Sequence, residues 1–219
     1  MVVVEFLSKM SPAAVQNRVA MFDQNYKLDW DKWIRALDSE SGLGGNATAM
    51  FGKLLGKWGA VRPRPLRRCR AKAEHQPPFL EDLIQAAEPS LAALEGVTLR
   101  EADRASANQV GALAELWRVL GALPQVGEAG CVGVSKGVML LTRGKIGPAL
   151  DRFVRQELGV KRPEHAAAWM ELLAAIAGDI HKFEERYGRL ERCLGEKVTE
   201  AGVGRLYDML AGPKQDRPR

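Results

Sequence analysis

The 219-residue chain contains few cysteines, and no two of them lie close together in the sequence. No Cys-x-x-Cys pair occurs among Cys69, Cys131 and Cys193. This absence argues against a zinc ribbon and against a cysteine-bound iron–sulfur cluster. An odd number of widely spaced cysteines is typical of reduced thiols in a cytosol, so we expect a cytoplasmic protein.

Long apolar runs are also missing. The first ten residues, MVVVEFLSKM, have only a short apolar run and no basic leader, so we do not expect a signal peptide. No run approaches the length of a transmembrane helix, so we expect no membrane partner. The three histidines lack metal-ligand spacing, and there is no phosphate-binding P-loop or dinucleotide fingerprint. We therefore expect no metal and no cofactor.

The composition that is present is that of a soluble globular protein, with 46% hydrophobic and 27% charged residues. The length suits one large domain or two small ones. The formal net charge is +5 and the isoelectric point is about 9.2. This moderate basic excess permits an anionic partner without requiring one.

Patterns of alternating polar and apolar residues are nearly absent, and helical periodicity dominates, which predicts an all-α fold. Residues 2–7 read as a short strand or as an apolar arm. We expect a two-lobed helical domain, with lobes formed by 1–75 plus 161–212 and by 76–160, followed by a flexible tail at 213–219. The predicted helices cover approximately 12–22, 29–37, a segment after Asn46, 79–88, 90–95, two segments capped by Thr98 and Ser106, 166–187 and 199–210.

The most informative stretch runs from Gly130 to Val160. It begins with a glycine-rich turn and a short apolar segment, followed by a basic loop that contains glycines. Asp151 then stands directly before the helical pattern RFVRQEL, which stops at Gly159. An aspartate in that position predicts an N-cap, because its carboxylate accepts hydrogen bonds from unpaired backbone N–H groups. Those bonds and the positive end of the helix would keep the carboxylate ionised.

This stretch resembles the core of the helix-hairpin-helix DNA glycosylases, the HhH-GPD superfamily. The matching pieces are Val132-Gly133, Lys136, 138–141, Pro148, Asp151, Val154 and Leu158-Gly159. Residues 123–127, Leu-Pro-Gln-Val-Gly, also resemble the hairpin signature, at a greater distance from Asp151. The chain departs from the family pattern where Arg152 and Phe153 follow the acid and Leu150 precedes it.

The resemblance implies that Asp151 stabilises the positive charge that develops on the sugar during glycosidic cleavage. The other interpretation of Asp151 is a plain helix cap. In family members that also nick the strand, a lysine near the position of Lys136 forms a Schiff base with the sugar. For Lys136 we favour a phosphate contact over this nucleophilic role, so lyase activity is doubtful.

Further residues are candidates for holding DNA. The hairpin glycines would let backbone N–H groups approach a phosphate, and a dense arginine cluster would grip the backbone. The alternatives are an ordinary helix–helix turn and a solvated linker. Two tryptophans close in sequence are candidates for a base pocket, although helical-core packing is the commoner role. The phosphate-binding candidates are Gly127, Gly130, Gly133, Ser135, Arg143, Lys145, Arg62, Arg64, Arg67 and Arg68, and the base-pocket candidates are Trp30 and Trp33.

The sequence therefore predicts a monomeric, cofactor-free DNA glycosylase-like enzyme. It would bind double-stranded DNA, flip a damaged or modified base into a cleft between two helical lobes, and cleave its N-glycosidic bond. The alternative is a non-catalytic helical module that binds nucleic acid or a partner protein through its basic surface. In that case Asp151 would be only a cap.

Overall fold

The structure is a computed structural model that describes residues 2–39, 43–61, 80–124, 130–194 and 201–214. It confirms the all-α prediction, because the described residues contain helices and no sheet, with one isolated bridge between Phe22 and Lys214. The α-helices are α1 (Pro12–Ala20), α2 (Gln24–Ser39), α3 (Gly45–Lys57), α4 (Leu80–Ala93), α5 (Ala107–Leu120), α6 (Gly130–Leu141), α7 (Arg152–Leu158), α8 (Ala166–Tyr187) and α9 (Val203–Ala211). The short 3-10 helices are η1 (Leu7–Lys9), η2 (Leu99–Arg104) and η3 (Leu190–Cys193).

Helix starts follow the local capping residues. The side chain of Ser11 accepts a hydrogen bond from the backbone N–H of Ala14, and Pro12 occupies the first helical position. Thr98 and Ser106 each form a capping box at the start of η2 and α5. The three caps predicted at these positions are therefore confirmed.

The segment 2–7 is an arm, one of the two forms predicted for it. Two other elements differ from the sequence prediction. A single helix, α4, continues through Pro89, although two helices were expected on either side of it. The helix continues because residues on both sides of the proline are packed against the core. Leu83 and Ala87 are buried before Pro89, and Ser90 is buried after it. Helix α6 begins at Gly130, so the predicted glycine-rich turn is the first part of a helix.

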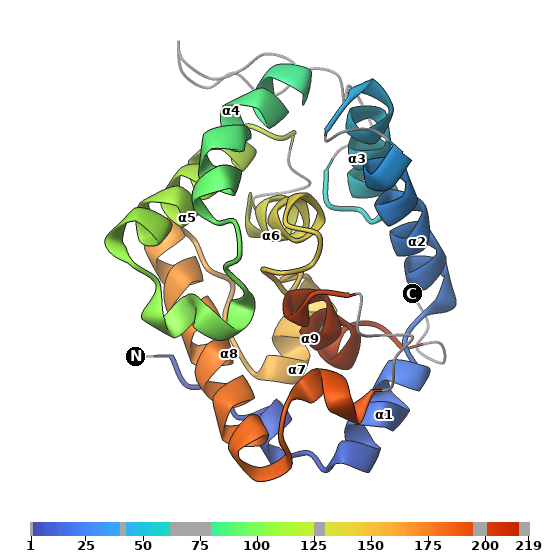
Figure 1. Cartoon of the computed structure of the whole chain (residues 1–219), viewed down its shortest axis with the longest axis vertical. Coiled ribbons are helices and arrows are strands. Elements are labelled where there is room, and N and C mark those ends of the chain that lie inside the picture. Colours follow the sequence, from blue (N-terminus) through green and yellow to red (C-terminus); the bar gives the residue numbers. More distant parts are fainter. Residues whose placement is uncertain (1, 40–42, 62–79, 125–129, 195–200, 215–219) are drawn as a thin grey trace.

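The helices surround a central group (Figure 1). Helices α4, α5 and α8 pack together on one side, and α2 and α3 pack together on the other, with α6, α7 and α9 between them. Nearly every residue of α6 and every residue of α9 is buried. One connected hydrophobic core includes Trp33, Leu116, Trp169 and Leu206, and so draws on both predicted lobes. No helix within the described residues has the length and apolar character needed to span a membrane.

A buried carboxylate fastens the N-terminal arm to the core. Asp179 in α8 accepts hydrogen bonds from the backbone N–H groups of Phe6, Leu7 and Ser8, at 3.2, 2.7 and 3.0 Å. The same carboxylate accepts a bond of 2.7 Å from the hydroxyl of Tyr207 in α9. Asp179 is only 1% exposed. One side chain thus joins three segments that are far apart in the sequence.

A second buried charge group joins η2 to the end of α8 and to η3. The guanidinium of Arg100 donates to Glu184 at 2.6 and 2.8 Å and to Glu191 at 2.9 and 3.0 Å. Burial opposes ionisation of Glu184, but the bonds from Arg100 and from the backbone N–H of Leu190 outweigh it, so the pKa of Glu184 lies below its ordinary value. The ionised carboxyl is therefore the form that the fold stabilises.

We predict that Asp179→Ala lowers the free energy of unfolding by at least about 3 kcal/mol, because it leaves buried N–H groups and a hydroxyl without an acceptor. Urea denaturation measures this change. Asp103→Ala removes a partly exposed carboxylate that faces His181, and it is the matched control with an expected loss below about 1 kcal/mol. Equal losses in the two variants would show that Asp179 does not anchor the arm.

We also predict a pH-dependent effect of Glu184→Gln. At pH 7 the variant loses about 1–3 kcal/mol of stability, because a charged acceptor of Arg100 is gone. A lowered pKa in the folded state gives stability that is present above the ordinary value of 4.5 and is lost as pH falls through the folded value. The difference between the variant and the wild type therefore shrinks below pH 4.5. Glu185→Gln, at the exposed neighbouring position, should show no such trend in denaturation curves recorded from pH 3 to pH 7.

Candidate functional site

Asp151 lies at the start of α7, as the sequence predicts. Its Oδ1 accepts hydrogen bonds from the backbone N–H groups of Phe153 at 3.0 Å and Val154 at 3.1 Å. At the other end Gly159 adopts φ +65°, a left-handed conformation that favours glycine and terminates the helix. The predicted N-cap and the predicted end of this helix are both confirmed.

The second carboxylate oxygen of Asp151 faces a lysine. Oδ2 lies 3.5 Å from Nζ of Lys136, which comes from α6. The ammonium of Lys136 also donates a 3.0 Å hydrogen bond to the backbone carbonyl of Trp58, the C-cap of α3. Lys136 is only 3% exposed. Lys136, for which we predicted a phosphate contact, is not placed for one in this arrangement, because its ammonium lies inside the protein and is already bonded there.

A second ion pair borders the same place. Arg205 and Asp208 of α9 form an ion pair of 2.5 Å, and both side chains are buried. Asp208 also accepts a hydrogen bond of 3.1 Å from the backbone N–H of Ala149, two residues before Asp151. The guanidinium of Arg205 stacks over the rings of Phe22 and Trp30, each at 4.9 Å from the ring centroid. It also donates to the carbonyl of Tyr26 at 3.1 Å.

Close backbone packing brings α9 to this position. Gly202 and Gly204, at the start of α9, touch the loop between α6 and α7 at Gly144 and Gly147. The backbone N–H of Arg205 donates to the carbonyl of Gly144 at 2.9 Å. A Cβ atom at Gly204 would lie only 2.5 Å from the backbone nitrogen of Gly147. The absence of side chains at these glycines therefore sets the distance between the two ion pairs.

The four charged groups meet around a small cavity. Lys136, Asp151, Arg205 and Asp208 line it, and the remaining lining is largely aromatic and apolar, from Phe22, Tyr26, Trp58, Met139, Ala149 and Pro213. Its volume is about 10 Å³, which is the space of about one water molecule. The cleft for a flipped base that we expected beside Asp151 is therefore not open in this arrangement.

The electrostatics of the cavity follow from burial and from charge balance. Burial raises the pKa of Asp208, the nearby Asp151 raises it further, and Arg205 and Lys136 oppose this. Burial also lowers the pKa of Arg205, and the charge of Asp208 opposes that change. Two cations and two carboxylates thus balance one another in a place that excludes water, where an unpaired charge would be costly.

Two of the predicted phosphate-binding residues, Ser135 and Gly133, are buried in α6. Ser135 is 1% exposed, and its hydroxyl accepts a 2.9 Å hydrogen bond from the backbone N–H of Leu150, which fixes the chain just before Asp151. Gly133 is buried within α6, so it does not form the hairpin turn. A contact between a phosphate and either of them is incompatible with this burial. Gly130 is the first residue of α6, and Gly127 lies outside the described residues.

The other predicted DNA contacts are on the surface or outside the described chain. Arg143 is exposed and pairs with Asp38 at 2.8 Å, and Lys145 is half-buried in the same loop. Neither lies at the Lys136–Asp151 cavity. The arginine cluster of Arg62, Arg64, Arg67 and Arg68 lies outside the described residues.

The two tryptophans proposed for a base pocket are core residues. Trp33 is fully buried, packs against Phe51, and donates a 3.0 Å hydrogen bond from its indole N–H to the carbonyl of Leu140. Trp30 is 7% exposed and one face of its ring is covered by Arg205. A base-stacking role for Trp33 is therefore wrong for this fold, because no face of its ring is free.

Sequence reasoning missed Arg205 and Asp208, which complete the charge group. The sequence GRLYDML at 204–210 does indicate that these two residues pair. An arginine and an aspartate three residues apart in a short helix with apolar residues on all sides predict a buried ion pair. Trp58 and Tyr26, whose rings lie 5.6 Å apart at the cavity, gave no comparable signal.

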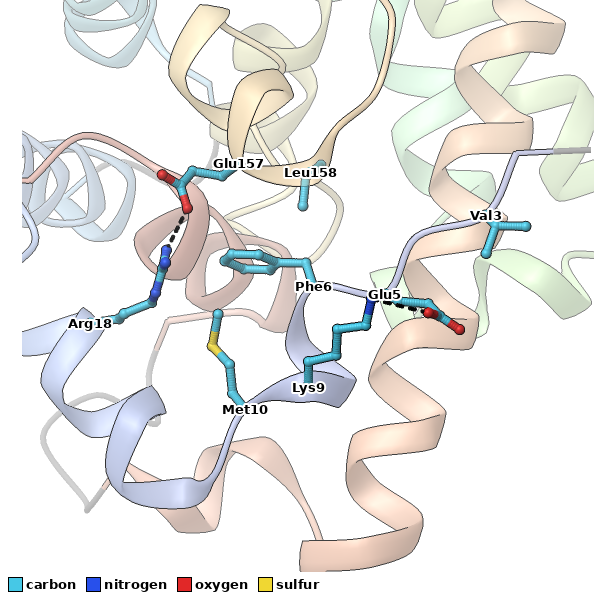
Figure 2. A pocket seen from close by; sticks show the side chains of 8 residues that line it. All are labelled: Val3, Glu5, Phe6, Lys9, Met10, Arg18, Glu157 and Leu158. Atoms are coloured by element: carbon cyan, nitrogen blue, oxygen red, sulfur yellow. Dashed lines mark hydrogen bonds and ion pairs between the residues drawn. The ribbon is translucent and has the colours of Figure 1, made fainter.

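A separate hollow lies where the N-terminal arm meets α1 and α7 (Figure 2). Arg18 pairs there with Glu157 at 2.9 Å and lies over the ring of Phe6 at 5.0 Å, and Lys9 pairs with Glu5 at 3.2 Å. Each cation that lines the hollow is thus matched by a carboxylate. The charge group at Lys136 and Asp151 remains the candidate site.

Comparison of the chain with known protein-family models, with curated proteins and with solved structures finds no significant match to any of them. Within the described residues there is no group of three or more histidine, cysteine or acidic side chains placed to hold a metal ion. The function is therefore argued from the site itself.

We predict that Gly204→Ala destabilises the fold by about 2 kcal/mol or more, because the new methyl group collides with the backbone at Gly147 and pushes α9 away. The control is Gly111→Ala in the exposed face of α5, where a Cβ meets nothing within 4 Å. That substitution should stabilise the protein by about 0.5–1 kcal/mol, since alanine favours helix over glycine. Thermal denaturation of both variants measures the change in stability, which should be negative for Gly204→Ala and positive for Gly111→Ala. Unchanged stability of Gly204→Ala would contradict the packing argument.

Proposed function

We propose that this protein is a DNA glycosylase-like enzyme in which Asp151 and Lys136 act on the sugar of a flipped nucleotide. One observation carries the proposal. A lysine and an aspartate that the family resemblance singles out separately, fifteen positions apart, lie 3.5 Å from each other at the same cavity. A buried, paired lysine and carboxylate form a common arrangement for catalysis as well as for structure.

The chemistry would use both groups. Cleavage of the bond between base and sugar builds positive charge on the sugar, and an ionised carboxylate next to it stabilises that charge. The ammonium of Lys136 becomes a nucleophile only after it loses a proton, and a neighbouring carboxylate can accept that proton. Attack of the amine on C1′ would form a new C–N bond as the bond to the base breaks, and the departing base would take the proton that Asp151 received, which leaves the carboxylate ionised. Opening of the sugar ring would then give the imine that links Lys136 to C1′. Without this attack, water would complete the cleavage beside Asp151.

The order of elements supports the proposal. The pentapeptide at 123–127, which resembles the hairpin signature, falls in the connection between α5 and α6, which pack against each other. Helix α6 then carries Lys136, a loop follows, and α7 begins directly after Asp151. The order of a hairpin-like sequence, a helix, a loop and an acid-capped helix is the order of the family pattern.

Access to the site requires an opening movement. The cavity holds about one water molecule, and its lining includes Tyr26, Trp58 and Arg205, of which Arg205 also lines the surface groove along α2. A nucleobase reaches Asp151 only after these side chains move apart. In the proposed cycle, DNA binding supplies the free energy for that opening, as extrusion of a base generally requires.

A second candidate is a non-catalytic helical module. The small volume of the cavity favours it, and so does the complete use of Asp151 as a cap and of Lys136 as a partner for the carbonyl of Trp58. In this alternative the charge group only fixes α3, α6, α7 and α9 relative to one another. DNA or a partner protein would then bind elsewhere on the surface.

We predict that the full-length protein releases a modified base from one member of a panel of duplexes that carry oxidised, alkylated, deaminated or hypermodified bases. Released bases are detected as strand breaks after alkali treatment. Asp151→Asn should reduce the rate by about 100-fold or more. Asparagine keeps the N-cap of α7, but the variant is less stable because Lys136 loses its charged partner. Reduction with borohydride during the reaction should trap a covalent complex, and Lys136→Gln should abolish it.

Asp103→Asn provides the matched control, since it alters a partnered carboxylate away from the cavity. Circular dichroism and DNA affinity are recorded for every variant, so a misfolded protein is not mistaken for an inactive one. DNA affinity without breaks on any substrate would favour the module. Breaks that persist in both Asp151→Asn and Lys136→Gln would remove these residues from the mechanism.

A further inference from the structure

A groove runs along one face of α2, and its other lining residues are Val19 of α1, Ala201, and Arg205 and Met209 of α9. Its volume is about 610 Å³, within the usual range of small-molecule sites. The α2 residues that line it recur every three or four positions from Gln24 to Asp38, so they share one face of the helix. The groove is separate from the Lys136–Asp151 cavity, and Arg205 lines both.

Two donors in the groove lack acceptors. Lys27 is half-buried, and its ammonium forms no ion pair or hydrogen bond with the described residues. Burial, with a contribution from the charge of Arg205, lowers the pKa of Lys27. Arg205 is 1% exposed, and its Nε–H donates to no described group. An uncompensated buried donor of this kind is costly, and a bound water, ion or ligand can supply the missing acceptor.

The charges of the groove leave an excess of positive charge. Asp38 is neutralised by Arg143 at 2.8 Å, and Arg205 is neutralised by Asp208. Of the charged residues that line the groove, Lys27, Arg35 and Asp31 then remain, and together they carry a net positive charge. An anion placed near Lys27 would balance this excess and would gain hydrogen bonds in a site that is partly shielded from water.

The remainder of the groove is apolar. Leu28 is 54% exposed, Ile34 is half-buried, and Met209 contributes from α9. A simple ion such as phosphate would leave this surface uncovered. A ligand with an apolar body would bury it, at about 25 cal/mol for each Å² of apolar surface removed from water.

We propose that this groove binds an organic anion, a phosphate or carboxylate group carried on an apolar body, with the oxyanion at Lys27 and Arg205. The apolar body lies against Leu28, Ile34 and Met209. The ligand contacts neither Lys136 nor Asp151, and its binding is measured without DNA, so this proposal is tested separately from the cleavage chemistry.

The test uses the full chain and three probes: phenyl phosphate, benzoate and inorganic phosphate. Isothermal titration calorimetry measures affinity, and backbone amide shifts of the isotope-labelled protein locate the bound probe. We expect phenyl phosphate or benzoate to bind about tenfold more tightly than inorganic phosphate, with shifts centred on Lys27 and Leu28. Whichever of the two organic probes binds better identifies the headgroup that the groove prefers.

Lys27→Gln should weaken binding of the organic anion about tenfold. Lys32→Gln is the matched control, because Lys32 is an exposed lysine of α2 that does not line the groove. Leu28→Ser should weaken the organic probes and leave inorganic phosphate unchanged. Absence of saturable binding by both organic probes overturns the proposal, and so do equal effects of Lys27→Gln and Lys32→Gln. Equal affinity for inorganic phosphate and the organic probes overturns the assignment of an organic ligand.

Discussion

The arrangement of the central helices depends on two buried ion pairs that must be satisfied together. Lys136 and Asp151 form one pair, and Arg205 and Asp208 form the other, around a cavity with the volume of about one water molecule. Three further hydrogen bonds hold these groups: Lys136 donates to the carbonyl of Trp58, Arg205 donates to the carbonyl of Tyr26, and Asp208 accepts from the backbone N–H of Ala149. Removal of any one charge would leave a buried partner uncompensated, which is far more costly than a lost surface pair. Helices α3, α6, α7 and α9 are therefore held in one relative arrangement.

Features that depend on neighbouring residues were predicted well from the sequence. Ser11, Thr98, Ser106 and Asp151 cap helices as expected, because a cap is a contact between residues two or three positions apart. The end of α7 at Gly159 follows from the left-handed conformation that glycine adopts readily. The all-α fold class followed in the same way from helical periodicity across most of the chain.

Features that depend on distant residues were not predictable in this way. Periodicity indicates that a helix has a buried face, but it does not say which side chain lies opposite. Lys136 was interpreted as a surface lysine, whereas its ammonium bonds to a carbonyl 78 positions away in the sequence. The glycines of α6 were interpreted as a turn, although the packing around α6 buries nearly all of it and holds it helical. The pairing of Arg205 with the ring of Trp30 likewise joins α9 to α2 without a local signal.

The anchoring of the arm at residues 6–8 by Asp179 has a consequence for the timing of folding. The acceptor lies more than 170 positions further along the chain than the N–H groups that it binds, and its fourth donor, Tyr207, comes later still. During synthesis, residues 6–8 emerge well before Asp179, so their backbone N–H groups have no carboxylate to dock on at that stage. The arm is thus fixed in place only after α8 and α9 have been made, and a chaperone or protease would find it accessible until then.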